Sequence, residues 1–313
     1  MNLSHLKYAV EVANCGSINK AAENLFMGQP SLSRSIKELE ESLNIEIFSR
    51  SAKGMELTPD GEIFIKYAKS ILKQVDDVEN IFSHKNVPNK KFSVSVPRAS
   101  YMGKAFAEFS KTLNYENDVE LLYKETNSSK TFKNILEGEY RLGIVRYAEN
   151  YDRFYKKYFE EKGLVGELIA KFKYVLLMNK DNPMAELDEI RFDDLENYIE
   201  IAHADPFVPS VPLASVKKEE LPDNIRRRIF VFERASQLEI LSTNPEAFMW
   251  VSPTSSEVLK KNGLVEKKCV DNNRVYKDVM IYKSDYTLSK LDKDFITELI
   301  KAKREILGKE SEI

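Results

Sequence analysis

The sequence predicts an α/β protein in three parts: a small winged helix-turn-helix at the N-terminus, one long helix, and two α/β lobes. Three observations support this prediction. Apolar residues recur at helical spacing through the first 43 residues and then alternate with polar ones up to Thr58. One helical pattern runs from Pro59 for more than twenty residues, and beyond residue 91 strand-like and helix-like stretches alternate.

Composition limits the function classes. The chain has 313 residues, 42% hydrophobic and 31% charged, as expected for a soluble protein of two or three domains. A formal net charge of −3 gives no overall attraction to nucleic acid, so any DNA contact must be local. Only Cys15 and Cys269 are present, which suits a reducing compartment. Without a signal peptide or a membrane-spanning run, a cytoplasmic protein with no membrane partner is expected.

Three short helices are expected in the first 43 residues. The first stops near "NCGS", whose Asn14 and Gly16 favour a turn. Ser17 is a suitable N-cap for the second, "INKAAENLF". The third runs from about Gly28 to Leu43 with Pro30 in its first turn, where a missing N–H costs nothing. Its predicted core stripe is Leu32, Ile36, Leu39 and Leu43.

The opposite face of the third helix predicts contact with duplex DNA. It carries hydroxyls and cations and no acid in its first two turns. Arg34 is the best candidate for a base-edge contact, to guanine, while Lys37 lies where a phosphate contact is expected. The alternative is an ordinary solvated face. With the neighbouring turn and second helix included, the expected DNA contacts are Gln29, Pro30, Ser31, Ser33, Arg34, Lys37 and Lys20.

The stretch "NIEIFSRSAKGMELTP" predicts a two-stranded hairpin, because apolar and polar residues alternate on both sides of "SAKG". Three helices followed by a hairpin form a winged helix-turn-helix. The wing carries Arg50, Ser51 and Lys53, for which we expect salt-dependent contact with the DNA backbone or the minor groove. The alternative is an ordinary charged turn.

The helix from Pro59 predicts self-association. Its apolar residues are separated by three or four positions, as in a coiled coil, and the small domain before it is too short to bury them all. Pairing with a second copy is favoured, and pairing with another helix of the same chain is the alternative. The seam consists of Phe64, Tyr67, Ile71, Val75, Val78 and Phe82.

The rest of the chain predicts two βαβ units. "FSVSVP", "VELLY" and "YRLGIVRY" read as strands separated by helices, and a second unit begins at "AKFKYVLLMNKDNPMAE". "YKDVMIYK" and a final helix close the chain. This alternation predicts mostly parallel sheets with flanking helices.

The order of these parts, and the wording of "GSINKAAENLFMGQPSLSRSIKELEESLNIEIFSRSAKGMELTPDG" from Gly16 to Gly61, resemble the LysR-type transcriptional regulators. "LEGEYRLGIV" and "YVLLMNKDNPMA" match that family more loosely. The resemblance implies a DNA-binding regulator with a partly palindromic operator and a two-lobed, periplasmic-binding-protein-like effector domain. It also implies a homodimer or homotetramer, with RNA polymerase as a candidate further partner.

Four regions are expected from the pattern and the resemblance together. Residues 1–58 form the DNA-binding domain and 59–87 the linker and dimerisation helix. Residues 88–168 with 270–313 form effector lobe I, and residues 169–269 form lobe II.

Two departures from the family wording affect these expectations. Gly28 stands where the family usually has Ser or Thr, so a side-chain N-cap is lost. "LSTNPEAFMWVSP", from Leu241 to Pro253, replaces a glycine-rich segment. Because glycines let a ligand approach the backbone, the family resemblance does not define the ligand surface of lobe II.

A small effector is expected beyond the carboxyl ends of the strands. "PRASY" follows the first strand and "ETNSSKT" the second, and by the family analogy these loops hold effectors. Arg98 and Arg146 suit an anionic, carboxylate-bearing effector. The alternatives are helix caps and surface charges. Including the loop at residues 203–210, the expected contacts are Arg98, Ser100, Tyr101, Thr126, Asn127, Ser128, Arg146 and Phe207.

No catalytic set emerges from the sequence. Its three histidines, His5, His84 and His203, lie in separate regions, and there is no GxSxG, GxGxxG or GxxxxGK[ST] motif. No metal and no cofactor are therefore expected. Two alternatives to the regulator remain: a small-molecule-binding protein whose helix-turn-helix is no longer used, and an enzyme of the two-lobed α/β type.

Overall fold

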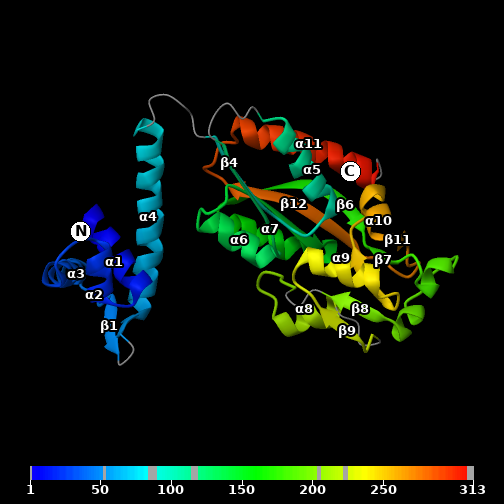
Figure 1. The fold of residues 1–313 in the computed structure, drawn as a ribbon, viewed down its shortest axis with the longest axis horizontal. Coiled ribbons are helices and arrows are strands. Elements are labelled where there is room, and N and C mark those ends of the chain that lie inside the picture. Colours follow the sequence, from blue (N-terminus) through cyan, green and yellow to red (C-terminus); the bar gives the residue numbers. More distant parts are fainter. Residues whose placement is uncertain are drawn as a thin grey trace. The chain divides into compact units, whose positions relative to one another are not determined.

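The computed structural model describes residues 2–51, 54–83, 90–113, 119–202, 206–220 and 225–308. The chain divides into two compact units, Met1–Pro88 and Asn89–Ile313 (Figure 1). Within the described residues, every helix is too short or too polar to cross a lipid bilayer.

The three N-terminal helices form where the sequence predicts them, except that α2 ends at Asn24, two residues before the predicted end at Phe26. α1 (Leu3–Cys15) ends at Gly16, whose φ of 61° is left-handed. α2 (Ile18–Asn24) begins after Ser17, whose hydroxyl accepts a hydrogen bond from the Lys20 N–H at 3.4 Å. α3 (Gln29–Leu43) begins after Gly28, which supplies no side-chain cap, as expected for glycine.

The core of the N-terminal unit is built on the predicted stripe of α3. Leu32, Ile36 and Leu39 are buried against residues of α1 and α2. β1 (Phe48–Ser51) pairs antiparallel with β2 (Gly54–Leu57), and α4 (Pro59–Ser83) follows. The predicted winged helix-turn-helix and long helix are confirmed.

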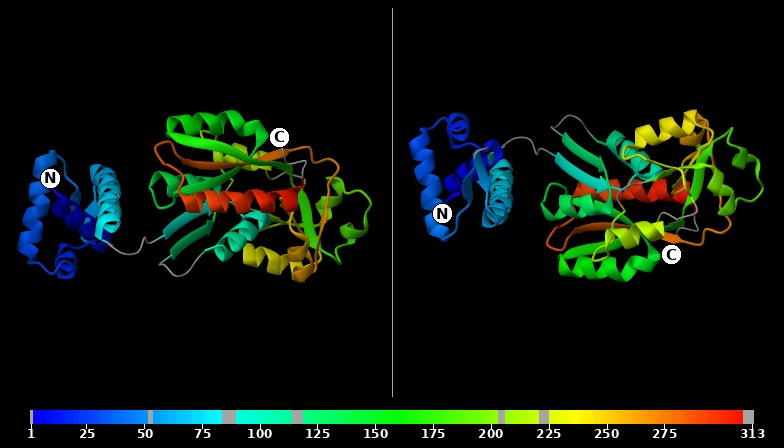
Figure 2. Two further views of the ribbon diagram at one scale, coloured as in Figure 1. Left: turned by 90° about the horizontal axis from the view of Figure 1, so that it is seen from above. Right: turned by 90° about the horizontal axis from the view of Figure 1, so that it is seen from below.

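The second unit begins with a five-stranded mixed sheet of order β4-β3-β5-β12-β6. β3, β4 and β5 are parallel, whereas β12 runs antiparallel to both of its neighbours. Helices α5 and α11 lie side by side on one face, and α6 and α7 cover the other (Figure 1, Figure 2). The elements of this lobe are β3 (Lys90–Val96), α5 (Ser100–Lys111), β4 (Val119–Glu125), α6 (Ser128–Leu136), β5 (Leu142–Ala148), a 3-10 turn (Glu149–Tyr151), α7 (Asp152–Glu161), β6 (Leu164–Lys173), β12 (Val275–Lys283) and α11 (Lys290–Leu307).

The second lobe is built on another five-stranded sheet, of order β11-β7-β10-β8-β9. β10, β8 and β9 are parallel, and β7 runs antiparallel to β10 and β11. Its elements are β7 (Val175–Asn179), two 3-10 turns (Pro183–Glu186 and Asp193–Asn197), β8 (Ile199–Ala202), α8 (Leu213–Glu220), β9 (Arg228–Phe230), α9 (Arg234–Thr243), β10 (Ala247–Val251), α10 (Ser256–Asn262) and β11 (Leu264–Lys267).

In each sheet four of the five strands run in the same direction, so the predicted mostly parallel sheets are confirmed. The exceptions are β12 and β7, which run against their neighbours, and one boundary between the lobes needs correction. The first sheet extends to Lys173, five residues beyond the expected boundary at residue 168, since all of β6 pairs with β12. Periodicity alone does not separate the end of β6 from the start of β7.

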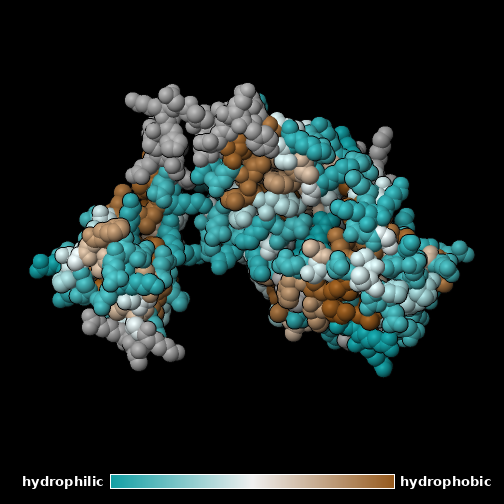
Figure 3. Space-filling view, in the orientation of Figure 1, coloured by the Kyte–Doolittle hydropathy of each residue, from teal (hydrophilic) through white to brown (hydrophobic). Residues whose placement is uncertain are grey.

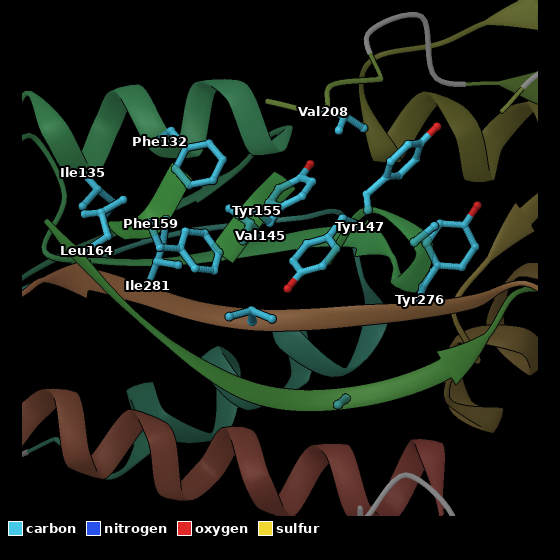
Figure 4. Packing of buried hydrophobic residues seen from close by; sticks show 14 of the residues in the cluster. Phe132, Ile135, Val145, Tyr147, Tyr155, Phe159, Leu164, Val208, Tyr276 and Ile281 are labelled. Atoms are coloured by element: carbon cyan, nitrogen blue, oxygen red, sulfur yellow. The ribbon is translucent and has the colours of Figure 1, made fainter. Parts of the chain in front are cut away.

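One hydrophobic cluster joins the two lobes. Tyr147, Tyr155 and Phe159 belong to the first lobe, and Val208 reaches the same cluster from the second (Figure 4). The Tyr155 hydroxyl donates a hydrogen bond to the Phe207 carbonyl at 2.6 Å. This contact holds the loop before α8 against the first lobe.

Candidate functional site

The outer face of α3 is open to solvent, as its pattern predicts. Arg34 and Lys37 are exposed and Ser33 is half-buried. Lys37 forms an ion pair with Glu41 at 3.6 Å, and both side chains are exposed, so the pair is weak and leaves Lys37 available. Gln29, Pro30 and Ser31 are exposed at the helix N-terminus, whose dipole favours anions such as phosphate.

The other expected DNA contacts are described in part. Lys20 is exposed on α2. Arg50 and Ser51 form the end of β1, where they pair with Met55 and Gly54. The side chains of Arg50 and Ser51, and the whole of Lys53, lie outside the described residues.

One face of α4 exposes apolar side chains. Tyr67 is 65% exposed and Val78 53%, and Ile71 and Ile63 are exposed on the same helix. The space-filling view shows hydrophobic residues at the surface over α4 (Figure 3). Phe64, the first residue of the expected seam, instead packs on the core of the N-terminal unit. Val75 is half-buried, and the Phe82 side chain lies outside the described residues.

A cavity of about 550 Å³ lies between the two lobes of the second unit. Its lining includes several aromatic rings together with arginines and carboxylates. A space between two lobes that is lined by aromatic side chains and a few polar groups is typical of a small-molecule site. Six of the expected effector contacts line it: Arg98, Thr126, Asn127, Ser128, Arg146 and Phe207.

Ser100 and Tyr101 do not line this cavity, contrary to expectation. The Ser100 hydroxyl donates a hydrogen bond to the Pro253 carbonyl of the second lobe at 3.2 Å. Tyr101 is fully buried and its hydroxyl donates to Asp278. The first turn of α5 therefore directs both side chains into protein contacts, whereas Pro97 and Arg98 before it line the cavity.

Arg146 lines the cavity but already has a carboxylate partner. Its Nε and Nη2 atoms each donate to Asp278 at 2.7 Å. Burial alone would lower the pKa of the Arg146 guanidinium, but the Asp278 carboxylate raises it above its usual range. Arg146 was expected to pair with an effector carboxylate, but its Nε and Nη2 atoms pair with Asp278 instead.

Arg98 is placed differently. It is half-buried at the cavity wall and has neither a hydrogen bond nor an ion pair with any described residue. A guanidinium in this position is free to bind an anionic ligand group.

The loop before α6 serves two purposes. The Asn127 side chain caps the helix by accepting from the Lys130 N–H at 2.8 Å. The Ser128 hydroxyl donates to the Arg146 carbonyl at 3.0 Å. The capping role stated as the alternative is thus present, while Thr126, Asn127 and Ser128 also line the cavity.

A second charged group in the cavity wall was not predicted from the sequence. Arg274 Nη2 lies 2.8 Å from Glu220 Oε1, and its guanidinium also faces the rings of Tyr151 and Tyr276. Burial raises the pKa of the Glu220 carboxyl. Glu220 ends α8, Tyr151 lies between β5 and α7, and Arg274 and Tyr276 lie at the start of β12. Because these segments are far apart in the sequence, no local motif predicts that they meet.

The departure at "NPEAFMW" is visible in the cavity. Trp250, which belongs to β10 and to the segment that replaces the family's glycine-rich wording, lines the cavity, and its ring meets that of Phe192 edge-on with 6.3 Å between the centroids. A bulky indole here narrows access to the β10 backbone, so the second lobe offers a ligand rings rather than main-chain amides.

Direct contacts also tie the lobes together on the side of α9. Arg234 Nη1 donates to the Ala99 carbonyl at 3.1 Å and to Glu125 at 3.2 Å. With the Ser100 and Tyr155 bonds, these contacts hold the lobes together around the cavity.

Comparison with known proteins finds a family model that matches the N-terminal unit. Residues 3–62 match the family described as "Bacterial regulatory helix-turn-helix protein, lysR family". The HTH-type transcriptional regulator BenM of Acinetobacter baylyi is 42% identical over 78 residues, covering 25% of this chain and 26% of BenM. AlsR of Bacillus subtilis, described in the same words, is 27% identical over 202 residues, covering 63% of this chain and 62% of AlsR. The chain thus matches about a quarter of one relative and less than two thirds of the other.

Among solved structures, full-length CbnR in complex with its target DNA has a TM-score of 0.61 and 16% identity. The match covers 96% of this chain and 100% of the CbnR chain. At this identity the likeness concerns the fold, and it confirms the predicted sequence of helix-turn-helix, long helix and two-lobed domain.

Proposed function

We propose that the chain is a transcriptional regulator of the LysR type, because its residues 3–62 match the family of bacterial regulatory helix-turn-helix proteins of that name. It binds a partly palindromic duplex operator through its N-terminal unit and responds to a small molecule in the cavity of its second unit. The observation that carries this proposal is the exposed Arg34 face of α3, on a helix fixed by a buried stripe.

The DNA-binding part rests on the geometry of α3. A helix that enters the major groove by its N-terminus presents first-turn side chains and N–H groups to bases and phosphates. Arg34 is exposed about one and a half turns after Gln29, which suits a bidentate contact with guanine. CbnR, which shares this fold, is described in complex with its target DNA.

The effector part rests on the cavity and on Arg98. Since Arg146 is engaged by Asp278, Arg98 is the described arginine best placed to hold a ligand carboxylate, with Asn127 and Ser128 beside it in the same wall. Binding across both lobes favours one lobe arrangement over others, and that difference in affinity is what a regulator needs for switching.

The assembly part rests on α4. Its exposed apolar stripe suits pairing with a second copy, because a two-fold symmetric reader matches two operator half-sites. A homodimer or homotetramer follows from this pairing, and RNA polymerase is a candidate further partner.

The proposal is tested with full-length protein and a duplex site that it selects from a random-sequence library. We expect Arg34→Ala to weaken binding by about 1–3 kcal/mol and to relax the preference at one base pair, as measured by fluorescence anisotropy. Lys69→Ala, on the exposed face of α4 away from the seam, is the control. Equal binding by Arg34→Ala and wild type would contradict the proposed groove contact.

The same experiment separates the alternatives. A protein that selects no duplex, yet is stabilised by small molecules, would be a two-lobed binding protein with an unused helix-turn-helix. Chemical conversion of a bound molecule would indicate an enzyme.

A further inference from the structure

Phe26 combines two unfavourable properties in the turn between α2 and α3. Its side chain is 98% exposed. Its φ of 52° lies in the left-handed region, which glycine and asparagine adopt more readily than an aromatic residue. The other described non-glycine residues with positive φ are Asn44 and Ser210, both small and polar.

The turn itself explains why Phe26 points outwards. The Phe26 N–H donates to the Glu23 carbonyl at 3.1 Å, and the Met27 N–H donates to the Ala22 carbonyl at 3.0 Å. These bonds fix the backbone so that Leu25 and Met27 pack on the core of the N-terminal unit. Between two inward side chains, the side chain at position 26 is left in solvent.

Folding therefore gives no reason for phenylalanine at this position. Glycine or asparagine would fit the backbone with less strain, and a polar side chain would be better solvated. An exposed apolar side chain on a strained backbone points instead to a function outside the fold.

We propose that Phe26 is a DNA-contacting residue that packs against a thymine methyl group and its deoxyribose at the edge of the major groove. This inference rests on the proposed function. Phe26 stands three residues before Gln29, at the end of α3 that meets the duplex first. Aromatic and other apolar side chains read thymine through its C5-methyl group, which adenine, guanine and cytosine do not present in the groove.

The contact adds a specificity that Arg34 does not supply. Arg34 reads a guanine by hydrogen bonds, whereas an apolar contact at position 26 favours thymine at a base pair nearer the end of the half-site. It is also insensitive to salt, unlike the phosphate contacts expected of Lys37 and Lys20.

The test uses full-length wild type, Phe26→Asn and Phe26→Tyr on the duplex site that wild type selects from a random library. Asparagine tolerates the left-handed backbone, so Phe26→Asn should unfold at the same temperature as wild type or above it. Its affinity for the selected site should be about tenfold weaker, while Phe26→Tyr, which keeps the ring, should stay within about twofold.

A second arm removes the methyl group from the DNA. Replacing each thymine of the selected site by deoxyuracil should weaken wild-type binding about threefold at one position in each half-site and leave Phe26→Asn unaffected there. Coupling between the two changes identifies the contact.

Three outcomes would overturn the inference. If Phe26→Asn binds the selected site as tightly as wild type while Arg34→Ala does not, Phe26 has no role in DNA binding and the regulator proposal stands. If deoxyuracil weakens wild type and Phe26→Asn equally at every position, Phe26 does not contact a thymine methyl group, and the regulator proposal again stands. If wild type selects no duplex at all, this inference fails together with the proposed function.

Discussion

Arg146 and Asp278 form a bidentate ion pair in the interior of the first lobe, with both nitrogen–oxygen distances at 2.7 Å. The Asp278 side chain is fully buried, and that of Arg146 is 9% exposed. Tyr101 donates to the same carboxylate. This arrangement uses two of the residues expected to hold an effector to join β5, α5 and β12 at the cavity wall.

Replacing Asp278 by Asn should strongly destabilise the second unit. The substitution keeps the shape of the side chain but leaves the Arg146 charge buried without a counter-charge, which costs about 3 kcal/mol or more. Urea unfolding measures the loss. Glu41→Gln, which removes the partner of the exposed Lys37 pair, is the control and should have little effect. Similar midpoints for the two variants would mean that the buried pair adds no stability.

Replacing Gly61 by Ala should open the contact between α4 and the wing. A Cβ at this position would stand 2.0 Å from the Ile47 carbonyl oxygen, so backbone atoms must move. We expect a loss of about 2–3 kcal/mol, with faster amide hydrogen exchange in α4 and β1. Gly28→Ala, whose added Cβ meets nothing nearer than 3.9 Å, should cost less than about 1 kcal/mol. Equal losses would contradict the steric explanation.

Glu266 should make stability depend on pH. Burial raises the pKa of its carboxyl from 4.5 to about 7, against the opposing effect of the hydrogen bonds from Thr254. A raised pKa means that the folded protein holds the proton more tightly than the unfolded chain. The contribution of Glu266 to the free energy of unfolding is therefore complete below pH 4.5 and is lost as the pH rises through about 7.

Thermal unfolding at several pH values tests this account. Glu266→Gln cannot ionise, so it should gain stability relative to wild type between pH 5 and pH 8. A constant difference between the two proteins over that range would exclude Glu266 as a titrating group.

Charged residues on the exposed stripe of α4 should break self-association. Tyr67→Asp with Ile71→Asp places two carboxylates where a second copy is expected to pack, which should shift the protein to monomers in analytical ultracentrifugation. Lys69→Asp changes charge on the same helix away from the stripe and should leave the assembly intact. An assembly that survives the double substitution would place the interface elsewhere.

Arg98→Ala should abolish anion binding without weakening the fold. Arg98 has no partner to lose among the described residues, so the unfolding midpoint should match that of wild type. Thermal shifts with a panel of small mono- and dicarboxylates should disappear in this variant. Arg153→Ala, exposed on α7 outside the cavity wall, should respond as wild type does. Carboxylate-induced shifts that persist in Arg98→Ala would exclude Arg98 as the anchor.

The sequence by itself determined the N-terminal unit almost completely. Leu32, Ile36 and Leu39 recur along one helix, and that spacing sets both the buried face and the exposed face of Arg34. The end of α1 at Gly16 and the hairpin follow from equally local signals. The second helix is an exception, because the pattern "INKAAENLF" extends to Phe26 whereas α2 ends at Asn24 and Phe26 turns outwards. Packing of Leu25 and Met27 on the core decided that turn.

The cavity was decided by the tertiary structure. The sequence predicted Arg98 and Asn127 as site residues because each follows the carboxyl end of a strand. It did not predict which residues surround them. Asp278 lies 132 residues from Arg146, and Glu220 and Arg274 come from different lobes. Periodicity reports which face of an element is buried, and it carries no information about which distant side chain meets that face. Local hydrophobic spacing therefore fixed the elements and the exposed face of α3, whereas long-range packing paired Arg146 with Asp278 and left Arg98 at the cavity wall without a partner among the described residues.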